Sequence, residues 1–127
     1  EQTQDGVLDI VFVHWGAEYQ TKHNAAQEKL AHELIDAGVD LIIGHHPHVG
    51  QDFEQYKDKY IFYSLGNFVF DQYFSAEVQQ GLVLKLVLDK AQNKIELYPV
   101  KIKLAQAELI ENEAEDKVSE TLFFDFD

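Results

Sequence analysis

The stretch VDLIIGHHPHV, residues 39–49, decides the fold of this chain and indicates its function. A short run of aliphatic residues is typical of a buried strand, and three histidines within four residues follow it directly. Histidine is a common metal ligand at neutral pH because its neutral ring keeps a free lone pair. In an extended H-x-H segment both rings leave the same side of the backbone. We therefore predict a metal site that includes His46 and His48.

The residues before this stretch predict a βαβ unit. Residues 7–13 (VLDIVFV) are expected to form a buried strand, and residues 24–37 a helix that begins at a capping box and ends at Gly38. The short joints favour parallel, neighbouring strands, with the second strand at residues 39–43. His14 follows the first strand, so it should meet His46 and His48 at the carboxyl edge of the sheet, where open α/β sheets bind ligands. The expected capping pair is Asn24 and Gln27, and the expected apolar face of the helix is Ala26, Leu30, Leu34 and Ala37.

The remaining sequence predicts more strands. Residues 60–64 (YIFYS) should form a third strand that ends at a Gly66-Asn67 turn, and residues 81–88 and 94–104 should form a hairpin. Pro99 places the last strand at a sheet edge or at a bulge. An acidic composition predicts a solvated tail from about residue 108 to residue 127. The expected fold is a single α/β domain, a βαβ unit followed by strands and a C-terminal hairpin.

Composition excludes several classes of function. The chain has 127 residues and no cysteine, so disulfides and thiolate metal sites are excluded. Its net charge of −13 argues against a nucleic-acid partner. No apolar run approaches the ~20 residues that cross a bilayer, and neither a G-x-S-x-G nucleophile motif nor a glycine-rich phosphate loop occurs. The chain begins at Glu1 and has no methionine, so we expect it to be cut from a longer protein.

Two polar residues are candidates for catalysis. Glu18 lies four residues after His14 and could orient a ligand histidine, bind a metal or transfer a proton, although a solvated loop acid is equally compatible. Asn67 could supply an amide to a substrate or a metal-bound group, or serve only as a turn former, and Asp71 is similar.

Other side chains have structural interpretations. His45 should point away from its neighbours, which makes it the weakest candidate in the histidine cluster. His23 and His32 are expected at the surface or in helix packing. The aromatic residues of the next segment are more typical of a core than of a binding platform; they are Phe68, Phe70, Tyr73 and Phe74.

Three ordered segments carry a family resemblance. The chain resembles the bacterial capsule-synthesis CapA family, also called PgsA, the poly-γ-glutamate synthesis accessory protein. The resemblance is carried by residues 14–19 (HWGAEY), 38–49 (GVDLIIGHHPHV) and 63–71 (YSLGNFVFD). This family belongs to the calcineurin-like metallophosphoesterase superfamily. The resemblance runs from about residue 7 to residue 71 and implies the C-terminal half of an α-β-β-α sandwich. The early acidic and Asn-His motifs of the superfamily are absent from this sequence.

The resemblance also implies a site and a role. His14, His46 and His48 match superfamily metal ligands, with His14 and His46 on one ion and His48 on the other, and His45 stands where the superfamily usually has a glycine. The implied cofactors are two divalent ions in the complete domain, with manganese, iron and zinc equally compatible. The implied role is a metal-dependent hydrolase in the synthesis, release or export of poly-γ-glutamate, cleaving a phosphoester or an amide. The expected location is extracellular or at the cell surface, anchored to the membrane through the longer protein, with a membrane synthase complex as a further partner.

Two other functions would also account for the histidine segment. A non-catalytic accessory module of polymer assembly would keep the histidines as a remnant or as a single-metal site. A cupin or an amidohydrolase would also contain an H-x-H segment. The helix expected between two strands disfavours an all-β cupin, and the chain is far shorter than the ~250 residues of a (β/α)₈ barrel.

Overall fold

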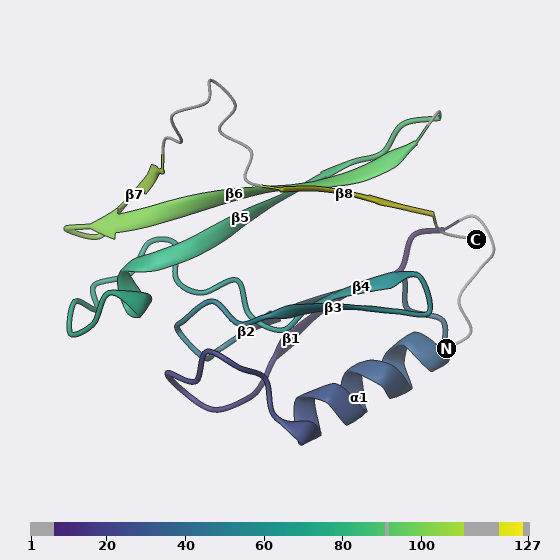
Figure 1. Ribbon diagram of the computed structural model, residues 1–127, viewed down its shortest axis with the longest axis horizontal. Coiled ribbons are helices and arrows are strands. Elements are labelled where there is room, and N and C mark those ends of the chain that lie inside the picture. Colours follow the sequence, from purple (N-terminus) through teal and green to yellow (C-terminus); the bar gives the residue numbers. More distant parts are fainter. Residues whose placement is uncertain (1–6, 91, 111–119, 126–127) are drawn as a thin grey trace.

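The computed structural model describes residues 7–90, 92–110 and 120–125, which form three layers (Figure 1). Helix α1 (Ala25–Asp36) covers the outer face of a first sheet, and a second sheet covers the other face. The first sheet contains, in spatial order, β1 (Ile10–His14), β2 (Leu41–His45), β4 (Lys59–Phe62) and β3 (Phe53–Tyr56). The second contains β5 (Gln80–Val87), β6 (Asn93–Lys103), β7 (Gln106–Leu109) and β8 (Glu120–Phe124), and the short 3₁₀ helix η1 (Glu77–Gln79) leads into β5. The predicted α/β class is confirmed.

The predicted βαβ unit is present. β1 pairs in parallel with β2, with His14 opposite His45, and β2 pairs in parallel with β4. The carboxyl ends of these three strands therefore lie at the same edge of the sheet. The expectation of a buried first strand is wrong, because β1 is an edge strand with one neighbour among the described residues, and Phe12 is 68% exposed.

Helix α1 begins at the predicted capping box. Asn24 Oδ1 accepts from the backbone N–H groups of Ala26 and Gln27 at 3.0 Å, and Gln27 Oε1 accepts from Asn24 N–H at 3.0 Å. Gly38 follows the helix with a φ of 104°, a conformation that glycine adopts without steric cost. The predicted apolar face is wrong: Leu30 is 42% exposed. The side chains buried on α1 are instead Gln27, Ala31 and Ile35.

Gln27 sets this rotation of the helix. Its side chain closes the capping box and also donates from Nε2 to Gln51 Oε1 at 2.9 Å, a contact between two buried residues. A polar residue with these partners can occupy a position that faces the sheet. The buried stripe therefore includes a glutamine that a hydrophobicity pattern assigns to solvent.

Two apolar clusters lie on opposite faces of the first sheet. Alternate side chains of β2 enter different clusters, with Leu41 and Ile43 toward the second sheet and Ile42 toward α1. Burial on both faces explains why β2 is a continuous apolar run. The cluster between the sheets contains Leu41, Ile43, Tyr60, Phe62, Ile95, Leu97 and Phe124. The cluster beneath α1 contains Trp15, Ala31, Ile35, Ile42, Ile61 and Tyr63.

Strand β3 was not predicted from the sequence. It forms a hairpin with β4, in which Tyr56 pairs with Lys59 across a two-residue turn. Lys57 and Asp58 both have positive φ, 49° and 63°, as two-residue hairpin turns require. The turn lacks the glycine that usually marks such hairpins, so sequence patterns did not reveal it.

The second sheet confirms the predicted hairpin of β5 and β6, whose register runs from Gln80 opposite Lys101 to Val87 opposite Lys94. The prediction that Pro99 marks an edge or a bulge is wrong, because β6 is the central strand. On its other side, β8 pairs with the first half of β6 and β7 with its end. Pro99 lies between these two ladders, so the absence of its N–H removes no hydrogen bond to β7 or β8. The Pro99 carbonyl accepts a hydrogen bond from Ile110 N–H at 2.9 Å.

The expected acidic tail is partly in the sheet. Glu108 lies in β7, and β8 pairs antiparallel with β6. The intervening residues 111–119 and the last two residues lie outside the described part of the chain. Among the described residues, no helix has the length and apolar character needed to cross a membrane.

Candidate metal centre

The candidate residues gather at the carboxyl edge of the first sheet. His14 ends β1, His46 and His48 follow β2, and Asn67 lies in the segment after β4. Two backbone hydrogen bonds join the loop after β1 to the loop after β2. Trp15 N–H donates to His45 O at 3.1 Å, and Tyr19 N–H donates to Pro47 O at 2.8 Å. These bonds place Glu18 beside the histidines.

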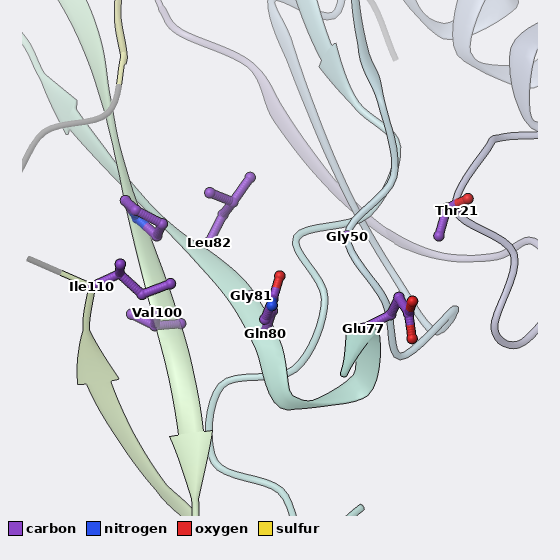
Figure 2. A pocket seen from close by; sticks show the side chains of 9 residues that line it. Thr21, Gly50, Glu77, Gln80, Gly81, Leu82, Val100 and Ile110 are labelled. Carbon is purple, nitrogen blue, oxygen red and sulfur yellow. The ribbon is translucent and has the colours of Figure 1, made fainter. Parts of the chain in front are cut away.

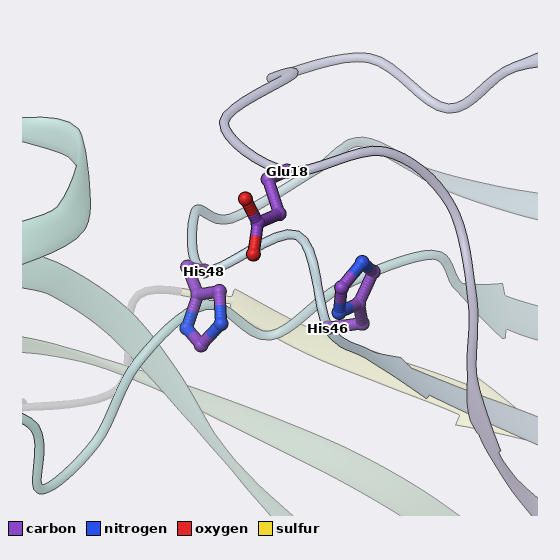
Figure 3. A group of neighbouring side chains, drawn as sticks. All are labelled: Glu18, His46 and His48. Carbon is purple, nitrogen blue, oxygen red and sulfur yellow. The ribbon is translucent and has the colours of Figure 1, made fainter.

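Glu18, His46 and His48 form one group of metal-binding side chains. Each offers one ligand atom, and these atoms all lie within 4.8 Å of one another. Figure 3 shows the Glu18 carboxylate pointing from its loop toward the space between the two imidazole rings. Donors bound at about 2.0–2.2 Å to one tetrahedral ion lie roughly 3–3.5 Å apart, so any donors near the 4.8 Å limit must move closer together to hold an ion. Glu18 is exposed, which leaves its side chain free to make that movement.

The histidine segment is a turn, so the prediction of an extended H-x-H segment is wrong. His46 and His48 both have positive φ, 101° and 61°, and Pro47 is buried between them. Non-glycine residues in such conformations cost on the order of 1–3 kcal/mol each and concentrate at functional sites. The turn, rather than strand alternation, brings the two rings together.

Gly44 is required by the close packing beneath this turn. A Cβ atom at Gly44 would lie 2.1 Å from Tyr63 O and 2.5 Å from Trp15 Nε1. The indole of Trp15 crosses the sheet at this point and donates from Nε1 to Tyr63 O at 2.8 Å. The glycine before the histidines therefore lets Trp15 join the ends of β1 and β4.

Asn67 contacts a histidine of the group rather than completing it. Its Oδ1 lies 3.0 Å from His48 Nδ1, and its Nδ2 donates to Val78 O at 3.0 Å. Asn67 is 7% exposed, and its contact with Val78 O is buried, whereas its contact with His48 is partly buried. A residue that served only to form a surface turn would not need to be buried in this way.

His14 lies at the predicted edge but outside the group of three. Its ring centroid is 4.5 Å from that of His46, with the rings tilted by 45°, and the side chain is exposed. The His45 ring stacks on Phe12 with the ring centroids 6.3 Å apart, and His45 is not part of the metal-binding group. Burial lowers the pKa of His45, and the charge of nearby His14 lowers it further.

A family model described as "Bacterial capsule synthesis protein PGA_cap" matches residues 1–72, which is more than half of the chain. The chain belongs to this family. The match contains every candidate site residue and confirms the resemblance carried by the three sequence segments.

Named relatives agree with this assignment. The chain is 46% identical over 95 residues to "Capsule biosynthesis protein CapA" of Bacillus anthracis, covering 75% of the chain and 23% of the relative. It is 45% identical over 96 residues to "PGA biosynthesis protein CapA" of Bacillus subtilis, covering 74% and 25%. A "Probable polyglutamine synthesis accessory protein" of Mycobacterium tuberculosis is 38% identical over 66 residues, covering 52% and 17%. The chain thus spans about a quarter of the first two relatives.

Two histidines of this PGA_cap chain lie elsewhere and pack as predicted. The His23 ring stacks on Tyr63 at 3.8 Å, and His23 Nδ1 lies 3.1 Å from Asp52 Oδ1. His32 on α1 stacks on Tyr56 at 3.9 Å, and its Nε2 lies 2.9 Å from a Glu54 oxygen. Both imidazoles therefore bind α1 and its preceding loop to the sheet.

The expectation of an aromatic core after Asn67 is wrong. The four rings, Phe68, Phe70, Tyr73 and Phe74, are between 36% and 64% exposed. Phe70 contacts the His48 ring at 4.9 Å, and Phe74 meets Tyr19 edge-on at 5.0 Å. These residues belong to a segment without helix or strand, and Phe70 is the ring of the four that lies against His48. Asp71 lies in the same segment and is not part of the metal-binding group.

Several clefts adjoin the second sheet. One, of about 300 Å³, is lined by Thr21, Gly50, Glu77, Gln80, Gly81, Leu82, Pro99, Val100 and Ile110. Figure 2 shows Leu82, Val100 and Ile110 on one side of it and Thr21 on the other. A more open cleft of about 470 Å³ includes His45, Asn67 and Phe68 in its lining. The open cleft adjoins the candidate metal centre through Asn67, but Glu18, His46 and His48 line neither cleft.

Proposed function

We propose that this chain supplies a divalent-metal site to a protein of capsule-polymer synthesis, with Glu18, His46 and His48 as ligands. The observation that carries the proposal is the convergence of two imidazoles and one carboxylate from separate loops. The proposed activity is metal-dependent hydrolysis of an anionic polymer such as poly-γ-glutamate. The names of the relatives, which refer to capsule and polyglutamine synthesis, support the polymer class.

The donor set fits the proposed ion. Imidazole and carboxylate together suit manganese, iron and zinc. Three protein ligands leave coordination positions open, as catalytic sites do and closed structural sites do not. A divalent ion bound there would supply Lewis-acid polarisation of a carbonyl or phosphoryl oxygen. The resemblance implies that His14 and His46 share one ion; because the group formed by His46 contains His48 and Glu18 instead, we assign the exposed His14 to a second ion whose other ligands come from outside this chain.

The charge of the protein supports a metal-mediated contact with the polymer. A chain of net charge −13 repels a polyanion, so an exposed cation site is the means by which the two could meet. Glu18 is exposed, which keeps the site accessible to a large substrate. We place this function at the cell envelope, where a capsule is assembled, with a membrane synthase complex as the further partner.

A non-catalytic accessory module is the second candidate. It is favoured by the small donor set, since the described residues contain one group of three metal-binding side chains and the chain spans about a quarter of its relatives. In this role the ion would hold the polymer without cleaving it.

Metal binding is the first test. Isothermal titration with Zn²⁺ and Mn²⁺ should give a saturable site in the native chain, weakened on the order of 100-fold or more by His46→Ala or His48→Ala, because each ligand carries a large share of the binding free energy. His32→Ala, which removes an imidazole outside the group, should leave the affinity unchanged. Equal affinities in all four proteins would refute the site.

The second test separates the two candidate functions. The metal-loaded chain is incubated with poly-γ-glutamate, and polymer length is followed by size-exclusion chromatography. Shortening that disappears in His48→Ala supports hydrolysis. Metal-dependent binding of the polymer with no change in its length supports the accessory module.

A further inference from the structure

The hydrogen bonds of Asn67 determine which nitrogen of His48 carries the proton. Val78 O can only accept, so the Asn67 atom 3.0 Å from it is the Nδ2 donor. The other amide atom, Oδ1, then faces His48 Nδ1 at 3.0 Å, and it can only accept. Nδ1 must therefore carry the proton in the neutral ring, which leaves the lone pair on Nε2.

The free nitrogen points toward the metal-binding group. Figure 3 shows one ring nitrogen of His48 on the side of His46 and the other on the opposite side. Since Nδ1 is engaged with Asn67, the nitrogen on the side of His46 is Nε2. A ligand histidine commonly donates its second N–H to an oxygen acceptor, which fixes the tautomer and the ring orientation.

Asn67 is itself held rigidly by the second sheet. Gly66 forms a β-bridge with Gly81, and a Cβ atom at Gly81 would lie 1.9 Å from Asn67 O. Val78, whose carbonyl fixes the amide, is fully buried in η1. Asn67 therefore links η1 and β5 to His48 at the edge of the first sheet.

We propose that Asn67 is a positioning residue, which holds His48 in the Nδ1–H tautomer and presents Nε2 to the metal. The part of this inference that concerns metal binding rests on the proposed metal site. The tautomer itself is a property of the metal-free chain and can be measured separately.

The tautomer is tested by long-range ¹H–¹⁵N NMR of the metal-free, ¹⁵N-labelled chain at about pH 8, above the usual histidine pKa of ~6.5. His48→Gln assigns the His48 signals among those of the six histidines. We expect the Nδ1–H tautomer in the native chain and a shift toward Nε2–H in Asn67→Ala. Asn67→Asp, which keeps an acceptor oxygen, should retain Nδ1–H, and so should Val78→Ala, which disturbs the packing but keeps the carbonyl.

Zinc titration supplies the functional part of the test. Asn67→Ala should lower the affinity about 10–100-fold, as the loss of such a partner does in other metal sites. A native Nε2–H tautomer, or the same tautomer in native and Asn67→Ala chains, would overturn the inference. So would an unchanged zinc affinity in Asn67→Ala. If the native chain binds no zinc, the proposed metal site fails, and the NMR spectra alone then decide whether Asn67 sets the tautomer.

Discussion

Gly44→Ala is the substitution whose effect follows most directly from the structure. The new methyl group would lie 2.1 Å from Tyr63 O, a backbone atom that cannot rotate away, and 2.5 Å from Trp15 Nε1. To accommodate it, β2 and β4 must separate or the indole must leave its hydrogen bond with Tyr63 O. Either response disturbs the strand ends from which the histidine turn and the Asn67 segment begin.

The expected cost combines two effects. Overpacking a dense interior costs about 1–3 kcal/mol. Loss of the indole donor leaves a buried carbonyl unpaired, which costs a further ~1–3 kcal/mol. The free energy of unfolding should therefore fall by about 2–6 kcal/mol, a large part of the ~5–15 kcal/mol that stabilises a typical domain.

Urea denaturation followed by tryptophan fluorescence measures this change, because Trp15 is the single tryptophan and lies at the contact. Gly50→Ala is the matched control, since a Cβ atom there meets nothing within 4 Å. It should leave the free energy of unfolding unchanged or raise it by up to ~1 kcal/mol. With a denaturant slope of ~1–3 kcal/mol per molar, Gly44→Ala should lower the midpoint by roughly 1 M or more. Equal midpoints in the two variants would refute the packing described at Gly44.

Three further changes test other contacts. Asn24→Ala removes the acceptor of two N–H groups at the start of α1 and should lower the free energy of unfolding by about 0.5–2 kcal/mol. Denaturation followed by circular dichroism of the helix measures this change, and an unchanged free energy of unfolding would contradict the capping box. Trp15→Phe removes the donor to Tyr63 O and should cost ~1–3 kcal/mol in thermal denaturation, and a neutral result would show that the carbonyl finds another donor. Hydrogen bonds from Lys85 and two further donors lower the pKa of Glu96 from 4.5 to about 2, so its contribution to stability is complete above pH 4.5 and is lost as the pH falls through 2. Melting temperatures over this range should fall less steeply in Glu96→Gln than in the native chain, and identical slopes would contradict the lowered pKa.

The parts of the fold that depend on local sequence were predicted well. The capping box of α1, the parallel strands on either side of the helix, and the long hairpin each come from a pattern within a short window. Strand β3 was missed because its four residues carry little pattern and its turn uses Lys57 and Asp58 rather than glycine. The position of Pro99 was misjudged because the gap between β7 and β8 depends on residues distant in the sequence.

The burial of single side chains was harder to predict than the elements that carry them. Leu30 is exposed although it is apolar, and Gln27 is buried although it is polar, because Gln27 finds partners in Gln51 and in the helix start. The aromatic residues after Asn67 are exposed because their segment joins neither sheet. Hydrophobicity along the chain does not record such partners, which come from other elements.

The sequence by itself determined the family, the βαβ unit and the arrival of His14, His46 and His48 at one edge of the sheet. The family resemblance is carried by three ordered sequence segments, whereas the βαβ unit and the shared edge follow from local periodicity and from the rule that parallel strands end on the same side. Only the tertiary structure decided that Glu18 joins His46 and His48, and that Asn67 binds His48 Nδ1. Asn67 and His48 are 19 residues apart in the sequence, and Glu18 and His46 lie in different loops. These contacts depend on the positive φ of His46 and His48 and on the packing of Trp15 over Gly44. Local sequence encodes where an element begins and ends, whereas the burial of single side chains and their direction at the site are set by contacts that form only when the two sheets and the helix pack together.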